Sequence, residues 1–130
     1  MRTIMAAALM LGAGTLAIPH LADMRAEAAA PVWGKGEYRY GTAARQALDF
    51  YPATNAQEGK RPLILFVHGG AWQFGDKGLS SRSGKAAHYP AQGYHLASVG
   101  YRLVPDVTVE KQAADIAASL RYLIDNADAF

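Results

Sequence analysis

A continuous run of apolar residues, Leu63 to Val67 (LILFV), constrains the fold of this chain more than any other feature. An unbroken apolar run of this length is typical of a strand buried on both faces, as in a parallel sheet covered by helices. The run ends in His68, Gly69 and Gly70. Consecutive glycines let the backbone turn sharply and approach a ligand closely. The sequence therefore predicts a buried strand followed by a tight turn, and such a turn can also serve only to connect two elements.

The neighbouring segments predict the elements around this strand. Alternating polar and apolar residues predict a β-hairpin within residues 34–53, and residues 94–101 form a second apolar strand. Residues 75–84 are rich in glycine and serine and are expected to be a loop, which a helix over residues 84–92 follows. Two buried strands joined through a helix imply a right-handed crossover. The expected fold class is α/β, a mostly parallel sheet with helices on both faces and an N-terminal antiparallel hairpin.

The best predicted helix covers residues 109–127. Its apolar residues recur at spacings of three and four, which places them on one face, the pattern of a helix that packs against a core. These residues are Val109, Ala113, Ile116, Ala117, Leu120, Leu123, Ile124 and Ala127. Polar residues, among them Asp115 and Ser119, are expected on the other side.

The first thirty residues have the three-part pattern of a secretory signal peptide. Arg2 supplies a positive charge, an uncharged apolar run covers residues 4–18, and an A-x-A cleavage site ends at Ala28. A signal anchor or a buried helix rich in alanine and leucine is the alternative. We expect residues 1–28 to be a cleaved leader and residues 29–130 to be part of one domain. The mature protein is then secreted or periplasmic and meets the membrane only during export.

The composition excludes several classes of function. A net charge of +2 over 130 residues, without a basic run, gives nucleic-acid binding no electrostatic support. The absence of cysteine excludes disulfides, thiolate zinc sites and a cysteine nucleophile. His88 and His95 have no third metal ligand at a sensible spacing, and the glycine-rich turn lacks the Gly-x-Gly-x-x-Gly and Gly-Lys-Ser/Thr motifs of nucleotide sites. We expect neither a metal nor another cofactor.

The turn after the apolar run has the chemistry of an oxyanion hole. Neighbouring N–H groups around Gly69 and Gly70 can converge on one point because neither glycine carries a Cβ. Acyl transfer needs such a point, since the carbonyl oxygen gains negative charge in the tetrahedral intermediate. The residues that follow, Ala71, Trp72 and a Gly-Asp pair at 75–76, favour this function over a plain turn.

With these flanking residues the chain resembles the α/β-hydrolase superfamily. It is most similar to the bacterial esterases and lipases that carry His-Gly-Gly-x-Trp, a group that includes feruloyl and acetyl esterases. The matching segments follow one another in this order: Tyr40-Gly41, 48–52, Arg61-Pro62, 68–72, 75–77, 98–103, Ala114-Asp115, Asn126-Ala127 and Phe130. The resemblance implies the N-terminal half of an α/β-hydrolase fold. It also implies a serine carboxylic-ester hydrolase that acts through an acyl-enzyme on a small-molecule or polysaccharide-linked ester.

The resemblance assigns roles to individual residues. The N–H groups of Gly70 and Ala71 form the oxyanion hole, and His68 and Gly69 support the loop. Trp72 lies beside the acyl pocket, with plain core packing as the alternative. The related prolyl oligopeptidase-like peptidases have a proline where this chain has Ala71, and a proline has no N–H to donate. Alanine therefore favours an esterase with two donors.

No serine in the sequence fits the nucleophile elbow Gly-x-Ser-x-Gly that such an enzyme needs. Ser98 comes nearest, but the residue two positions before it is leucine and the serine lies inside a predicted strand. His68 precedes any possible nucleophile, whereas the superfamily order is serine, acid, histidine. We expect the triad to lie beyond Phe130 and these residues alone to be inactive. The strand 63–67 is then an exposed apolar edge that invites pairing with other chains.

Two alternative functions stay open. A non-catalytic binding module can retain the sheet without a triad. An amide hydrolase of the formamidase or peptidase type belongs to the same superfamily, and nothing in the sequence separates a formamidase from an esterase.

Overall fold

A computed structural model describes residues 33–55 and 59–130. The predicted leader, residues 1–28, lies outside these described residues. The elements follow in the order β1 (Gly36–Arg39), β2 (Ala47–Tyr51), β3 (Leu63–Val67), α1 (Leu79–Arg82), α2 (Lys85–Ala91), β4 (His95–Val99), α3 (Val109–Asp125) and the 3-10 turn η2 (Ala127–Ala129).

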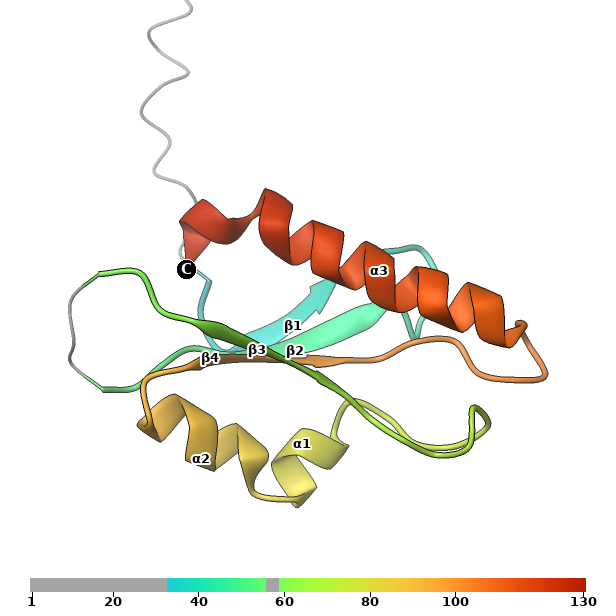
Figure 1. Ribbon diagram of the computed structural model, residues 1–130, viewed down its shortest axis with the longest axis horizontal. Coiled ribbons are helices and arrows are strands. Elements are labelled where there is room, and N and C mark those ends of the chain that lie inside the picture. Colours follow the sequence, from blue (N-terminus) through green and yellow to red (C-terminus); the bar gives the residue numbers. More distant parts are fainter. Residues whose placement is uncertain (1–32, 56–58) are drawn as a thin grey trace, which may run out of the picture.

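The four strands form one sheet in the order β1-β2-β4-β3. β1 and β2 form the predicted antiparallel hairpin, β2 pairs antiparallel with β4, and β3 pairs parallel with β4. Helices α1 and α2 cover one face and α3 covers the other (Figure 1). The α/β class, the helices on both faces and the hairpin are confirmed. The sheet is mixed rather than mostly parallel over these residues, because the hairpin makes two of the three pairings antiparallel.

The core lies between the sheet and the C-terminal half of α3. Leu48 and Phe50 of β2, Ala97 and Val99 of β4 and Leu123 of α3 are buried there together. Trp33 closes one side of this core, and its N–H donates a hydrogen bond of 2.8 Å to the carbonyl of Ala129. Aromatic rings and β-branched or leucine side chains supply most of the burial, which drives folding of this layer.

The orientation of α3 contradicts the prediction from its apolar face. Its buried residues are Gln112, Asp115, Ser119 and Leu123, of which only the last is apolar. Val109, Leu120 and Ile124 are 42%, 45% and 58% exposed. Asp115 and Ser119 can be buried because hydrogen bonds compensate their desolvation, whereas Gln112 donates through its amide nitrogen only. The apolar stripe instead faces sideways over the edge of β3, where it lines cavities with Val67 and with Leu63.

One prediction changes in the segment before β4. The glycine- and serine-rich residues 75–84 are not wholly a loop, because α1 lies within them. Asp76 stabilises this helix: its carboxylate accepts a hydrogen bond of 2.7 Å from the N–H of Gly78 and pairs with Arg82 at 2.9 Å. The helix predicted over residues 84–92 is confirmed as α2. It ends before Gly93, whose φ of +93° suits glycine.

β3 is an edge strand, as the sequence predicts. Within the part of the chain that the structure describes, it pairs with β4 on one side only. Its last residue, Val67, is 37% exposed, and its other side chains are partly buried. The open edge and the apolar stripe of α3 therefore border the same side of the molecule. No helix in the described ranges is long and apolar enough to cross a bilayer.

Candidate active site

The backbone after β3 turns through a strained loop, residues 68–75. Gly70, Ala71 and Trp72 have φ values of +135°, +49° and +64°. Ala71 and Trp72 are the only non-glycine residues with positive φ in the described ranges, and each such residue costs about 1–2 kcal/mol. A Cβ at Gly70 would collide with the carbonyl oxygen of Phe74, so the glycine is required. Strain of this kind concentrates at functional sites, where the surrounding structure maintains it.

The same loop presents unused backbone donors. The N–H groups of Gln73 and Phe74 both donate to the carbonyl of Gly70, at 3.1 and 2.9 Å. The N–H groups of Gly70, Ala71 and Trp72 donate no hydrogen bond to any residue that the structure describes. Gly70 and Ala71 are exposed, so a ligand can reach them. Adjacent free donors on a rigid turn can stabilise a developing negative charge.

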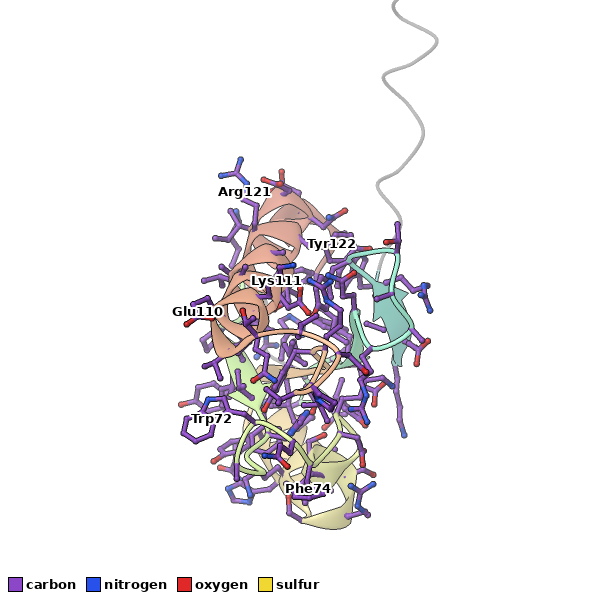
Figure 2. The ribbon with its side chains drawn as sticks, turned by 90° about the vertical axis from the view of Figure 1, so that its right-hand side faces the viewer. Trp72, Phe74, Glu110, Lys111, Arg121 and Tyr122 are labelled. Carbon is purple, nitrogen blue, oxygen red and sulfur yellow. The ribbon has the colours of Figure 1, made fainter. Side chains whose placement is uncertain are left out.

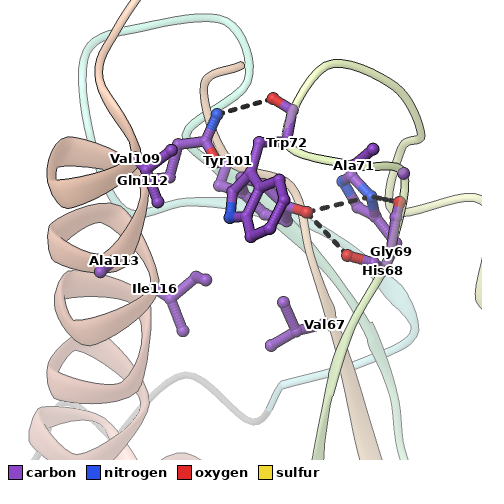
Figure 3. A pocket seen from close by; sticks show the side chains of 11 residues that line it. Val67, His68, Gly69, Ala71, Trp72, Tyr101, Val109, Gln112, Ala113 and Ile116 are labelled. Atoms are coloured by element: carbon purple, nitrogen blue, oxygen red, sulfur yellow. Dashed lines mark hydrogen bonds between the residues drawn. The ribbon is translucent and has the colours of Figure 1, made fainter. Parts of the chain in front are cut away.

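An open cavity of about 360 Å³ lies between this loop and α3 (Figure 3). Its lining residues come from the end of β3, from the loop, from Tyr101 and from the first turns of α3: Val67, His68, Gly69, Gly70, Ala71, Trp72, Tyr101, Val109, Gln112, Ala113 and Ile116. All five residues predicted for the site border this one cavity. The prediction did not include the residues of α3.

Trp72 lies at the surface of the molecule. Trp72 is 58% exposed and Phe74 is 69% exposed. Figure 2 shows the Trp72 side chain projecting outward at the edge of the molecule. Core packing, the alternative role for Trp72, is therefore wrong. The indole lies at the cavity, between the loop and α3 (Figure 3). Because the aromatic ring is exposed and not part of the core, it is available to contact a substrate.

His68 is buried at 2% exposure and braces the base of the loop. Its ring stacks on Tyr101 with centroids 4.4 Å apart, and its carbonyl accepts a hydrogen bond of 2.7 Å from the Tyr101 hydroxyl. Burial raises the pKa of that hydroxyl. His68 Nδ1 lies 2.9 Å from the carbonyl oxygen of Gly69, which can only accept, so the contact requires the proton on Nδ1. Nε2 is buried without a hydrogen-bond partner among the described residues.

Three further hydrogen bonds hold the loop. The carbonyl of Trp72 accepts hydrogen bonds from the N–H of Val104, at 3.0 Å, and from Gln112 Nε2, at 2.8 Å. Arg45 donates to the carbonyl of Gly75 at 3.1 Å. Sequence reasoning missed Gln112, because the apolar periodicity of α3 places this residue and Asp115 off the apolar face, and only the structure shows that both are buried.

A buried ion pair fixes α3 against the segment that follows β4. Arg102 contacts both carboxylate oxygens of Asp115, at 2.8 and 2.6 Å, and its backbone N–H donates to the same carboxylate at 3.1 Å. Gln46 donates to Asp115 at 2.8 Å. Burial opposes ionisation of Asp115, but the hydrogen bonds from Arg102 and Gln46 outweigh it, and the pKa of the carboxyl lies below its usual value.

The serine and the histidines that the sequence analysis considered for the triad lie on β4 and α2. Ser98 is fully buried in β4, and its hydroxyl donates to the carbonyl of Lys77 at 2.6 Å, which confirms its role as a strand residue. His95 is buried and accepts from the N–H of Ala53 at 3.2 Å, and burial lowers its pKa. His88 is exposed on α2. Among the residues described, no three His, Asp or Glu side chains gather into a possible metal site.

Known proteins are similar to this chain in fold and in sequence. Esterase B from Lactobacillus rhamnosis, solved as an inhibited crystal structure, superimposes with a TM-score of 0.63 at 37% identity, over 75% of this chain and 31% of that one. An isoprenylcysteine alpha-carbonyl methylesterase of Arabidopsis thaliana is 31% identical over 91 residues, which are 70% of this chain and 21% of the methylesterase. The kynurenine formamidase of Drosophila melanogaster is 36% identical over 88 residues, 67% of this chain and 28% of the formamidase.

The chain thus spans less than a third of the length of each of these relatives. A family model, BD-FAE, matches residues 48–130, from β2 to the end of the chain. That range includes β3, the strained loop, β4 and α3. With this match and the shared α/β-hydrolase architecture, the chain belongs to the BD-FAE family of α/β-hydrolase-type esterases.

Proposed function

We propose that this chain is the oxyanion-hole part of a serine carboxylic-ester hydrolase of the feruloyl and acetyl esterase type, with His68 to Trp72 as its His-Gly-Gly-x-Trp motif. The observation that carries this proposal is the pair of free N–H groups at Gly70 and Ala71. They lie on a strained turn at the carboxyl end of β3, at the wall of a cavity. That edge of an α/β sheet is where ligands bind.

In the proposed reaction the ester carbonyl oxygen accepts hydrogen bonds from Gly70 and Ala71. A serine hydroxyl supplied outside residues 1–130 attacks the carbonyl carbon, and a histidine takes the proton. The C–O bond to the alcohol then breaks, the histidine returns the proton to the leaving alcohol, and water hydrolyses the acyl-enzyme by the same route. Removing one such donor typically costs about 10²–10³ in kcat.

The test uses the protein in a form that contains the nucleophilic serine. We expect it to hydrolyse p-nitrophenyl acetate and to be labelled by a serine-directed phosphonate, whereas residues 1–130 alone do neither. A longer form that stays unlabelled and inactive supports the alternative of a non-catalytic module.

One relative favours a second candidate. The similarity to a kynurenine formamidase makes an N-formyl amide a substrate to compare with esters. The same two donors would bind the amide carbonyl oxygen. A kcat/KM higher for an N-formyl anilide than for the matched phenyl ester would assign the amide reaction.

Secretion is the remaining part of the proposal. Residues 1–28 act as the leader, and the mature chain begins near Ala29 in the periplasm or outside the cell. N-terminal sequencing of the exported protein tests this. A cytosolic protein that retains Met1 would refute it.

A further inference from the structure

Gln112 is a buried polar residue of α3 at the wall of the cavity. It is 2% exposed, and its Nε2 donates to the carbonyl of Trp72 at 2.8 Å (Figure 3). A carbonyl oxygen only accepts, so the amide nitrogen must face Trp72 and Oε1 must point elsewhere. Oε1 is buried without a partner in the described residues. The unpaired oxygen opposes folding, so the bond from Nε2 to Trp72 is gained at the expense of a buried polar atom.

The bond to Trp72 acts on the whole turn that carries the free donors. The N–H groups of Gln73 and Phe74 close this turn onto the carbonyl of Gly70, which makes residues 70–74 one compact unit. The unit holds two strained residues, Ala71 and Trp72. Its carbonyl at Trp72 is tied to the rest of the molecule by Val104 and by Gln112. Gln112 provides the only hydrogen bond between α3 and this turn in the described chain.

We propose that Gln112 is a positioning residue for the oxyanion hole, and this inference rests on the proposed function. Its side-chain amide fixes the orientation of the turn 70–74 and so aims the N–H groups of Gly70 and Ala71 at the reacting carbonyl. The substrate itself need not contact Gln112. Without the amide, the bond from Val104 is the one remaining hydrogen bond to the Trp72 carbonyl among the residues that the structure describes, and the turn can change its orientation.

The kinetic test compares Gln112→Leu and Gln112→Glu with the wild type, in the form of the protein that contains the nucleophilic serine. Leucine has a similar volume and no donor. We expect Gln112→Leu to lower kcat about 10- to 100-fold, with KM changed by less than about threefold, because misplaced groups lose transition-state contacts. Gln92→Leu is the matched control, since Gln92 is exposed at the end of α2.

Gln112→Glu supplies a readout that a purely structural role would not give. The ionised carboxylate repels the carbonyl of Trp72, whereas the protonated acid can donate to it. Burial raises the pKa of a carboxyl group, so the activity of this variant relative to the wild type should recover within a series that runs from pH 9 down to pH 5. A kcat of Gln112→Leu within twofold of the wild type, or a Gln112→Glu variant without this recovery, would overturn the inference.

An NMR measurement on the serine-containing form, without substrate, decides the same point independently of activity. In Gln112→Leu the amide resonances of Ala71 and Trp72 should shift, while those of the buried strand residues Leu48 and Ala97 stay in place. Unchanged resonances at Ala71 and Trp72 would refute the positioning role. A wild-type protein that shows no hydrolysis in its longer form would refute the proposed function instead, and the resonances would still test Gln112.

Discussion

Replacing Asp115 with alanine should destabilise the fold far more than replacing any other acid of α3. Asp115 is 2% exposed and accepts four hydrogen bonds, three from Arg102 and one from Gln46. Without the carboxylate, the N–H of Arg102 and the amide of Gln46 lose their acceptor. Removing one partner of a buried pair costs about 3–5 kcal/mol. The Arg102 side chain is 33% exposed and can recover water, so we expect the lower end, about 3 kcal/mol.

The assay is urea unfolding of the 130-residue chain followed by fluorescence. Trp33 is buried at 5% exposure and Trp72 is largely exposed, so the change in emission reports mainly the core. Asp125→Ala is the control: Asp125 also lies on α3, but its pair with Arg121 is on the surface, and such pairs contribute about 0–1 kcal/mol. An Asp115→Ala variant as stable as Asp125→Ala would refute the assignment of Asp115 as the structural link between α3 and the strand end.

The pH dependence of this effect has a defined sign. The pKa of Asp115 is lowered in the folded state, so the unfolded chain binds its proton first as the pH falls. The stabilisation is complete above the unfolded pKa, about 3.9, and is lost as the pH falls through the lower folded pKa. The difference in unfolding free energy between wild type and Asp115→Asn should therefore be constant from pH 7 to 5 and shrink below pH 4. A difference that grows on acidification would contradict the pairing.

Three further predictions concern the loop, the edge and the buried serine. Gly70→Ala brings a Cβ against the carbonyl of Phe74. It should lower the kcat of the serine-containing form about 100-fold or more and leave the packing of the core unchanged. A near-normal kcat would oppose the assignment of Gly70 to the oxyanion hole. We expect sedimentation velocity to show concentration-dependent self-association of the 130-residue chain. Val67→Lys places a charge on the open edge of β3 and should reduce it; equal association would place the contact elsewhere. Ser98→Ala removes the hydrogen bond to the Lys77 carbonyl and should lower the free energy of unfolding by about 1 kcal/mol. Phosphonate labelling of the serine-containing form should stay intact. Lost labelling would make Ser98 the nucleophile.

Local patterns in the sequence predicted much of this architecture and the position of the site. The apolar run of β3 specifies a strand by its composition, and the consecutive glycines specify a turn with unusual dihedral angles, because both properties depend on neighbouring residues only. The hairpin, α2 and the length of α3 follow from periodicity in the same way. The site prediction then needed one further step, which was the resemblance carried by residues 68–72.

The inward face of α3 could not be predicted from the same patterns. An amphipathic helix is expected to bury its apolar stripe, and here that stripe lies over the open edge of β3. The helix instead buries Gln112 and Asp115, whose partners Trp72, Arg102 and Gln46 come from separate parts of the chain. A buried polar side chain is stable only where those partners meet it.

The sequence by itself therefore determined the elements and the turn with free donors, because propensity, periodicity and glycine content are local properties. Only the tertiary structure decided which side of α3 faces the sheet, that Trp72 lies at the surface, and that Gln112 holds the loop. These outcomes depend on hydrogen bonds between residues up to 69 positions apart, and such bonds have no signature in any short stretch of the chain.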